Sequence, residues 1–517
     1  MSTNKSVVKS AGVIGLATLC SRILGFARDV VIARMFGVYI YAQAFVVAFK
    51  IPILLRDLLG EGASSAAFVP VFSEYKARRS PEAFWELANV VLNLLLVVVA
   101  LATLLGIIFS PLIVRLVAPG FSADPVKLAA TIQLNRIIFP YVILICLAAY
   151  ATGLLNSLKH FAVPAFAPCL LNISIIVFAL AFGEGITGLA LGVLVGGVLQ
   201  LAVQIPVLYK KGFRLKRPKT YRHPAAKEIG VLMLPRLFSS AIYQLNNFLD
   251  SIFGSFAWIV GEGGVAILYF SYRLVLFPLG IFSTSLSQAI LPTFSTQALE
   301  GTYDSLKKTL SFGLRATFFM LIPASLGFMV LSGPIITTIF QGGRFDAYSA
   351  GQTGRALFFY SIGLFAYGST RVLQSCFFAL KDTVTPTKVS FLALILNIIF
   401  NSILMFRMKI SGLALATSIS GIISFLVLFY LLRKRLGPFG IKDIANSFLR
   451  ILIASVAMAA LCSFVYAKVS VSSAGIWVRF MNLGLVIAAG LLSYALFCFI
   501  LGVREIRQVH QWLLKRR

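Results

Sequence analysis

The chain consists of long apolar runs that alternate with short polar and basic segments. Runs such as 90–113 and 483–501 contain no charged residue. Runs of about 18 or more apolar residues are typical of helices that cross a membrane. The pattern predicts fourteen helical segments, at residues 7–36, 40–76, 84–117, 126–157, 163–183, 186–210, 225–257, 263–297, 305–340, 350–380, 384–406, 411–434, 446–468 and 476–501. The expected fold is therefore all-α and polytopic, with about fourteen transmembrane helices.

Composition agrees with this fold class. Hydrophobic residues make up 59% of the chain and charged residues 12%, whereas soluble domains are nearer to about 45–50% and about 25%. The six cysteines and three histidines are isolated from one another along the chain and show no CxxC motif. No disulfide, metal site or other cofactor is expected from such a pattern.

The formal net charge of +29 first suggests a nucleic acid as partner, but its distribution favours a topology signal. If there are fourteen helices, most basic clusters fall on one side of the membrane, at 5–9, 76–79, 159, 210–227, 307–308, 381–388, 433–442 and 504–517. Cytoplasmic loops collect Lys and Arg. We therefore expect both termini to be cytoplasmic, contacts with membrane lipids, and no nucleic-acid partner.

An internal repeat divides the chain. The sequence GLAL begins at Gly188 and again at Gly412, and small residues continue at i+4 and i+8 in both copies. This spacing lets membrane helices approach closely. The repeat predicts two parallel six-helix lobes followed by two C-terminal helices. The predicted domains are a first lobe at 1–210, a basic linker at 211–227, a second lobe at 228–437, and the two extra helices with a basic tail at 438–517.

The apolar stretch 21–70 carries an unexpected number of charges. A charge at the bilayer centre costs about 2.5–3.5 kcal/mol on insertion scales, so such residues usually serve a function. Arg22, Gly25 and Asp29 are spaced i, i+3, i+7 and share one helix face, with Arg28 beside Asp29. Two interpretations remain open: the arginines bind an anion and Asp29 orients them, or Arg and Asp form purely structural pairs.

Further charges continue the pattern. Arg56, Asp57 and Glu61 interrupt the second apolar segment, and Arg273 interrupts a segment of the second lobe. Arginine stays charged and binds phosphate oxygens in a two-pronged geometry, so these residues are candidates for a phosphate or pyrophosphate site. The chain has no nucleotide-binding or hydrolase motif. Energy for transport would then come from the membrane potential, an ion gradient or a downstream reaction.

Several sequence motifs resemble those of one known family. They are SRILGFARDVVIARMFG from residue 21, FKIPILLRDLLGEGASSAAFVPVFSEY from 49, VAPGF at 117–121, PAFAPCLLNI at 164–173, FQGGRF at 340–345 and ALKDTVTPTKV at 379–389. The chain is similar over nearly its whole length to the MurJ (MviN) family of lipid II flippases, in the multidrug/oligosaccharidyl-lipid/polysaccharide exporter superfamily.

The resemblance implies a function and a set of site residues. It implies that lipid II, the undecaprenyl-pyrophosphate-linked peptidoglycan precursor, is moved to the periplasmic leaflet of the bacterial inner membrane by alternating access. It also implies a groove for the lipid tail in the two C-terminal helices, a link to peptidoglycan synthases, and no enzymatic activity. Family cavity arginines correspond to Arg22, Arg28, Arg56 and Arg273, and the candidate orienting or gating residues are Asp29, Gly25, Glu61 and Gln43.

Some positions depart from the family pattern. Gln43 stands where the family often has an acidic residue, and Tyr272 and Leu276 stand near Arg273 where acids are common. The coupling mechanism, by membrane potential or by a monovalent ion, therefore stays open. Two other functions also stay open: an ion-coupled multidrug or polysaccharide-lipid exporter of the same superfamily, and a non-transporting scaffold for cell-wall enzymes.

Overall fold

The protein folds into two compact units of α-helices. The computed structural model describes residues 3–56, 68–183, 185–217, 223–300, 303–469 and 475–506, and within these ranges the side chains of residues 3–11, 232–244, 246 and 247 are not described. One unit comprises residues 1–257 with 262–266, and the other comprises 258–261 with 267–517. No β-strand occurs in the described ranges, so the all-α prediction is confirmed. The predicted domain boundaries rest on the sequence repeat and stay a prediction.

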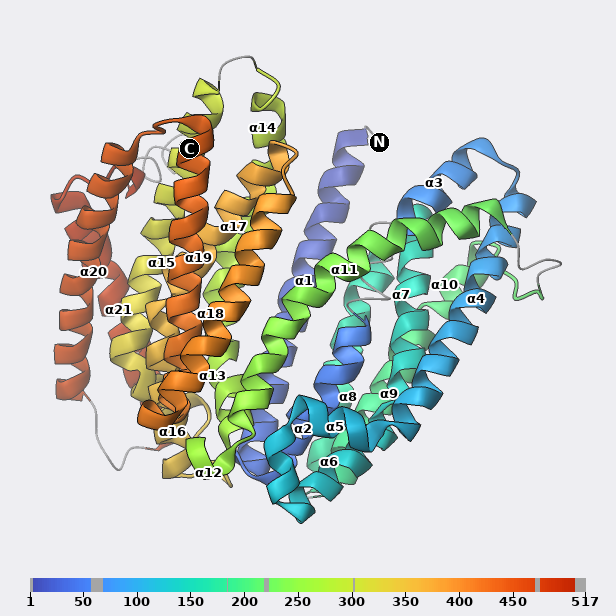
Figure 1. Ribbon diagram of the computed structural model, residues 1–517, viewed down its shortest axis with the longest axis horizontal. Helices are drawn as coiled ribbons and strands as arrows, with labels where there is room; N and C mark the ends of the chain where they lie inside the picture. Colours follow the sequence, from blue (N-terminus) through green and yellow to red (C-terminus); the bar gives the residue numbers. More distant parts are fainter. Residues whose placement is uncertain are drawn as a thin grey trace. The chain divides into compact units, whose positions relative to one another are not determined.

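The helices of the first unit follow the predicted segments closely (Figure 1). They are α1 (Thr3–Phe36), α2 (Ile40–Leu55), α3 (Val69–Arg78), α4 (Pro81–Ile108), α5 (Ser110–Val117), the 3₁₀ helix Pro119–Ala123, α6 (Pro125–Ile138), α7 (Tyr141–Ser157), α8 (Ala162–Phe182), α9 (Ile186–Ala202), α10 (Ile205–Lys210) and α11 (Pro224–Gly254).

The remaining helices belong chiefly to the second unit. They are α12 (Ala257–Val260), α13 (Gly264–Pro278), a π-helix at Leu279–Thr284, α14 (Ser285–Gln297), α15 (Asp304–Ile339), α16 (Ala347–Ile362), α17 (Leu364–Ala379), α18 (Val384–Met408), α19 (Ile410–Leu436), α20 (Ile441–Val469) and α21 (Ile476–Ile500).

Most of these helices can cross a membrane. Among the described residues, ten helical spans are long and apolar enough, and α16 with α17 make an eleventh if this pair, bent by 42°, counts as one span. The predicted segments 7–36, 40–76 and 225–257 correspond to α1, to α2 with α3, and to α11, which fall outside those spans. Part of segment 40–76 lies outside the described residues.

Several predicted segments are interrupted rather than continuous. Segment 84–117 divides before Pro111, segment 126–157 divides at Pro140, and segment 350–380 divides at Gly363. Segment 263–297 contains the π-helix directly after Pro278. Proline lacks the backbone N–H that an α-helix needs and its ring crowds the preceding turn. These interruptions explain how segments longer than the bilayer is thick are accommodated.

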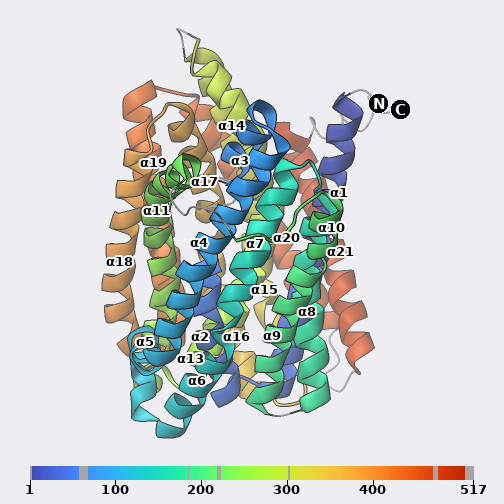
Figure 2. The same ribbon diagram turned by 90° about the vertical axis from the view of Figure 1, so that its right-hand side faces the viewer.

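The repeated small-residue stripe forms one tight helix pair in each unit. A Cβ added at Gly192 would lie 2.8 Å from Cα of Ile175, so α9 meets the backbone of α8 (Figure 2). A Cβ added at Gly412 would lie 2.4 Å from the carbonyl oxygen of Leu404, so α19 meets α18 in the same way. The close approach predicted from the GLAL repeats is therefore confirmed in both pairs.

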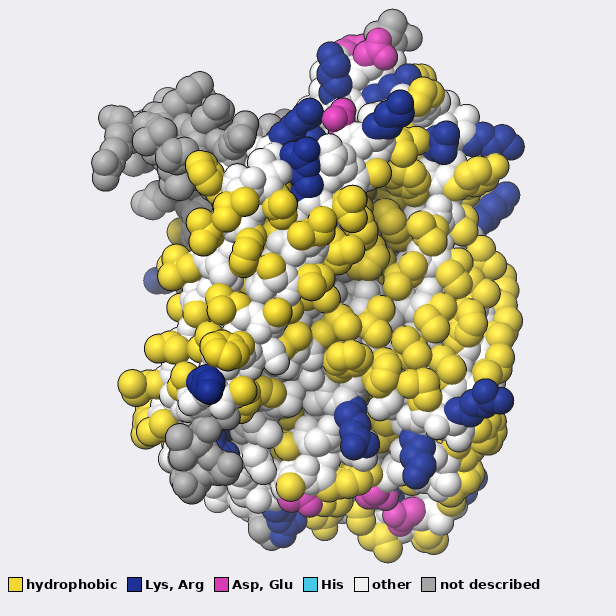
Figure 3. Space-filling model, turned by 90° about the vertical axis from the view of Figure 1, so that its left-hand side faces the viewer, with side chains coloured by type: hydrophobic (Ala, Val, Ile, Leu, Met, Phe, Trp, Pro, Cys, Tyr) yellow, Lys and Arg dark blue, Asp and Glu magenta, His cyan; other side chains and the backbone are white. Residues whose placement is uncertain are grey.

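The face of the second unit that carries α20 and α21 has the surface of a membrane protein. Hydrophobic side chains form a broad band there, with Lys and Arg above and below it (Figure 3). The band includes exposed residues of both helices, among them Leu449, Ile453, Leu492 and Leu496. Such an apolar exposed surface is stable only against lipid or another apolar partner.

The motif ALKDTVTPTKV has a structural role at the turn between α17 and α18. Asp382 Oδ1 accepts a hydrogen bond from the backbone N–H of Thr385 at 2.9 Å, and Oδ2 accepts one from the Thr385 hydroxyl at 2.8 Å. Arg435 of α19 forms an ion pair with the same carboxylate at 2.5 Å. Burial raises the pKa of Asp382, but these hydrogen bonds and Arg435 outweigh it and hold the pKa below its usual value of 3.8.

Asp382→Ala should destabilise the protein by about 1 kcal/mol at pH 7, because the first turn of α18 loses its acceptor. Asp382→Asn keeps an acceptor and should lose only the part of the stabilisation that depends on the carboxylate charge. Because the folded-state pKa is lowered, that part is present above pH 3.8 and disappears as the pH falls through the folded-state pKa. Thermal unfolding of the parent protein and the Asn variant in detergent, from pH 7 to below pH 3.8, measures this charge-dependent stabilisation. An Asn variant whose difference from the parent protein does not change with pH would contradict the assignment.

Candidate functional site

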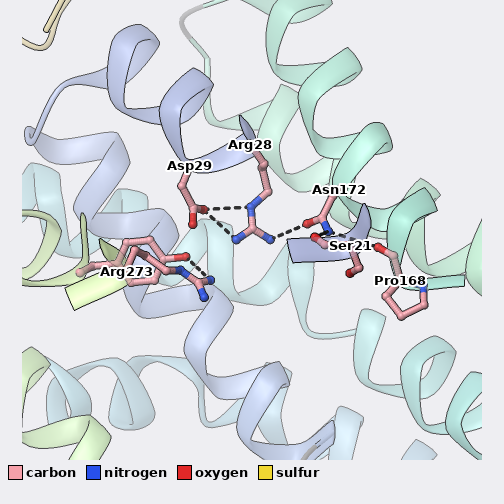
Figure 4. Close-up of polar contacts among 7 residues, drawn as sticks. Ser21, Arg28, Asp29, Pro168, Asn172 and Arg273 are labelled. Atoms are coloured by element: carbon pink, nitrogen blue, oxygen red, sulfur yellow. Dashed lines mark hydrogen bonds and ion pairs between the residues drawn. The ribbon is translucent and has the colours of Figure 1, made fainter. Parts of the chain in front are cut away.

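The predicted arginine cluster in α1 is built around Arg28. This side chain is only 4% exposed. Its Nε and Nη2 donate to Asp29 Oδ1 at 3.0 and 2.7 Å, and its Nη1 donates to Asn172 Oδ1 at 3.1 Å. Its guanidinium also lies 5.6 Å from the centre of the Phe49 ring. Figure 4 shows the guanidinium held between Asp29 and Asn172.

Asn172 connects this cluster to α8. Its Nδ2 donates to the backbone carbonyls of Ser21 and Pro168, at 3.2 and 3.3 Å. α1 continues through Gly25 without interruption, and a Cβ at that position would make only ordinary contact with Asn172, at 3.6 Å. Asn172 therefore fixes the guanidinium of Arg28 relative to both helices.

Arg56 lies in a different environment. It follows α2 directly and lines a cavity of about 670 Å³ within the first unit. The other walls come mainly from α7, α8 and the end of α9, with one residue each from α1 and α3, and are mostly apolar; their polar side chains include Thr152, Asn156, Gln200 and Gln204. A mostly apolar cavity with a few polar groups and one cation suits a ligand that carries an anionic group. The candidate gating residue Glu61, like Asp57, lies outside the described residues.

Among the described lining residues, Arg56 is accompanied by none of the other three predicted arginines, Arg22, Arg28 and Arg273. Arg22 is exposed on α1. Arg273, on α13 of the second unit, donates through Nη2 to the Tyr269 hydroxyl at 2.8 Å and stacks on the same ring at 5.0 Å. The π-helix begins six residues after Arg273, and Arg371 of α17 donates to Thr284 at its end. Arg371 thus joins α17 to the end of the π-helix.

A second charged network in the first unit was not predicted. Lys127 is 3% exposed, and its Nζ donates to Glu262 Oε1 at 2.8 Å. Gln43 donates to the same oxygen through Nε2 at 3.0 Å. An acid at position 43 would instead face the Glu262 carboxylate, and like charges in contact repel each other. The departure of Gln43 from the family pattern therefore fits its surroundings in this chain.

The VAPGF motif lies beside this network. The Lys127 ammonium lies 5.6 Å from the centre of the Phe121 ring. The backbone N–H of Gly120 donates to Ser255 Oγ at 2.9 Å, and a Cβ at Gly120 would lie 2.2 Å from the Ser255 carbonyl oxygen. Glycine is required at this position because the backbone of the 254–256 turn occupies the space.

Sequence reasoning placed Arg28 and Asp29 in the site but not Asn172, the other acceptor of Arg28. The available signal was the repeat, in which Pro164 and Asn172 correspond to Pro386 and Asn397. Asn397 has different partners in the second unit: it donates to Thr417 at 3.1 Å and accepts from Asn401 at 2.9 Å. Asn172 thus holds an arginine in the first unit, whereas Asn397 joins two helices in the second. No group of three or more His, Cys, Asp or Glu able to hold a metal ion occurs in the part of the chain that the structure describes.

Comparison with known proteins gives the class first. The fold is similar to a multidrug resistance MATE family transporter of the MOP superfamily in an inward-facing conformation, with a TM-score of 0.68 and 16% identity over 80% of this chain and 94% of that one. It is more similar to a solved structure described as lipid II flippase MurJ, inward closed conformation, with a TM-score of 0.79 and 29% identity over 94% and 98% of the two chains. The protein is thus a multi-pass membrane protein with the fold of this transporter superfamily.

The family follows from the sequence comparisons. A family model described as lipid II flippase MurJ matches residues 32–486. A probable lipid II flippase MurJ of Buchnera aphidicola subsp. Schizaphis graminum is 34% identical over 88% of both chains. One from Vibrio cholerae is 35% identical over 83% of both. The chain belongs to the lipid II flippase MurJ family.

Proposed function

We propose that this protein moves lipid II from the cytoplasmic to the periplasmic leaflet of the bacterial inner membrane by alternating access. Membership of the lipid II flippase family supports the substrate. The observation that carries the proposal is Arg56 at the wall of an otherwise mostly apolar cavity of about 670 Å³. The cavity is of the size typical of ligand pockets, so it would take the pyrophosphate and the groups next to it rather than the whole molecule.

The binding roles proposed for the arginines follow from the way a guanidinium binds phosphate oxygens. Arg22, Arg28, Arg56 and Arg273 would contact the pyrophosphate, each through charge-assisted hydrogen bonds. In the described arrangement, Arg28 already donates to Asp29 and Asn172. Pyrophosphate oxygens would replace one of these acceptors, with Asp29 orienting the guanidinium before and after. Gly25, Glu61 and Gln43 would serve in orienting or gating.

The remaining features of the proposal concern the membrane. Both termini would be cytoplasmic, as the distribution of Lys and Arg indicates. The exposed apolar faces of α20 and α21 would hold the undecaprenyl tail. No enzymatic step or bound cofactor is needed; the membrane potential or a monovalent ion gradient would drive transport, and peptidoglycan synthases would receive the product.

Depletion of the protein in a cell that depends on it tests this function. We expect lipid II to accumulate in the inner leaflet, followed by lysis, because precursor synthesis continues while export stops. Extracted lipid II and the fraction labelled by an impermeant reagent are measured during depletion. Normal growth with an unchanged exposed fraction would contradict the proposal. An ion-coupled drug exporter of the same fold would instead give drug resistance on overproduction and leave the lipid II pool unchanged.

A further inference from the structure

A second cavity lies at the start of α4, away from Arg56. It has a volume of about 370 Å³ and is lined by the first two turns of α4 and by residues 212–217 of the basic linker. Its charged lining comes from two carboxylates on α4, Glu82 and Glu86, and from three cations on the linker, Arg214, Lys216 and Arg217. None of the proposed transport steps uses these residues.

A single buried side chain holds the two walls together. Asn89 is 3% exposed, and its Nδ2 donates to the carbonyls of Trp85 and Arg214 at 2.9 and 3.1 Å. Its Oδ1 accepts from the backbone N–H of Lys216 at 2.8 Å. Phe213 is buried against the Trp85 ring, with centroids 5.8 Å apart. The linker is therefore fixed on α4, and the cavity between them is a defined feature of the fold.

The charges that face this cavity do not neutralise one another directly. Within the described residues, no ion pair joins Glu82 or Glu86 to a linker cation. Arg214 is engaged elsewhere, since its Nη1 donates to the carbonyls of Tyr209 and Phe213, both at 2.9 Å. Lys216 and Arg217 are left as the cations best able to meet an anion. The cavity thus presents an acidic wall and a basic wall to whatever enters it.

The position of the cavity indicates a lipid. On α4 the exposed apolar side chains begin at Leu96, about 16 Å along the helix from Trp85. On the linker side, Leu215 is 66% exposed and Tyr209 is 42% exposed. Exposed apolar and aromatic side chains next to basic ones are typical of the membrane–water interface. A headgroup at this level could reach the cavity while its acyl chains lie along α4.

We infer that this cavity binds the headgroup of a zwitterionic phospholipid with a primary amine, that is, a phosphatidylethanolamine. Lys216 and Arg217 take the phosphate, and Glu86 with Glu82 takes the ammonium group, which also lies against the Trp85 ring. A lipid whose headgroup carries only a negative charge would pair with Lys216 and Arg217 but would leave the two carboxylates without a cation. A quaternary amine cannot donate hydrogen bonds to them, so phosphatidylcholine fits less well.

The test measures lipid retention by the purified full-length protein. The delipidated protein is incubated separately with phosphatidylethanolamine, phosphatidylglycerol and phosphatidylcholine of identical acyl chains, and the lipids retained are counted by native mass spectrometry. We expect the unaltered protein to retain phosphatidylethanolamine in preference to the other two. Glu86→Gln should lower that retention about threefold to fivefold, the range expected for an exposed ion pair, without lowering the retention of phosphatidylglycerol.

Matched variants separate the site from general charge effects. Lys216→Gln with Arg217→Gln should lower phosphatidylethanolamine retention, whereas Lys211→Gln, an exposed linker lysine outside the cavity, should not. Glu74→Gln on α3 is the acidic control, because this exposed residue pairs with Arg78 instead. Equal retention of the three lipids would overturn the inference. So would a loss of phosphatidylethanolamine that is the same in Lys211→Gln as in the cavity variants.

Discussion

Arg28→Ala is expected to abolish the ability of the protein to support growth when it is the cell's sole lipid II flippase. The guanidinium is the central donor of the α1 cluster, and a charge-assisted hydrogen bond contributes about 1.5–3 kcal/mol. Loss of about 2 kcal/mol of substrate binding corresponds to a roughly thirtyfold weaker interaction. Growth of complemented cells and binding of lipid II to the purified variant measure the effect.

Folding must be separated from function in this experiment. Arg28→Ala leaves Asp29, which is 1% exposed, without its closest cation, and removing one partner of a buried ion pair destabilises by about 3–5 kcal/mol. The double variant Arg28→Gln, Asp29→Asn removes both charges together and should fold better than Arg28→Ala, yet still fail to bind lipid II. Arg28→Lys keeps the charge but loses the two-pronged donor geometry of the guanidinium, so this variant should bind lipid II weakly. A stable double variant with normal lipid II binding would show that the pair is only structural.

Gly192→Leu is expected to prevent most of the protein from folding. A Cβ at this position already comes within 2.8 Å of Cα of Ile175 and 3.2 Å of Cβ of Phe178, so α8 and α9 would have to separate. Overpacking of this kind costs about 1–3 kcal/mol when side chains can move, and more when the obstacle is backbone. The yield of monodisperse protein after detergent extraction and its thermal midpoint measure the loss.

Gly484→Leu is the control for that substitution. Gly484 is an exposed glycine of α21, and a Cβ there meets nothing within 4 Å. The same change should leave yield and thermal midpoint close to those of the parent protein. If Gly484→Leu and Gly192→Leu lowered the yield equally, the loss would reflect helix propensity or lipid contact rather than the packing of α8 on α9.

The helices could be predicted because each one corresponds to a local run of apolar residues in the sequence. The apolar runs predicted where the membrane-length helices lie, and the GLAL stripes at Gly188 and Gly412 identified two of the close helix pairs. The breaks before Pro111 and at Gly363 were less predictable, because proline and glycine also occur inside unbroken membrane helices. Pro168, for example, lies within α8.

The partners of charged residues could not be predicted in the same way. Arg28 and Asp29 are adjacent in sequence, but Asn172 is 144 residues from Arg28. Lys127 is buried against Glu262, 135 residues away, and nothing in the sequence around either residue indicates this pairing. A hydrogen bond between distant residues leaves no periodic trace in a single sequence. Residue types therefore identified candidates for the site, and only the fold supplied their partners.

The most direct measurement is the accessibility of lipid II to an impermeant probe added outside cells in which this protein is the sole candidate flippase. The account predicts that the labelled fraction is high with the unaltered protein, falls towards the level of depleted cells with Arg56→Gln, and is unchanged with the control Lys211→Gln. Arg56 lines the cavity from which the proposal starts. A labelled fraction that remains high after depletion of the protein would contradict the account.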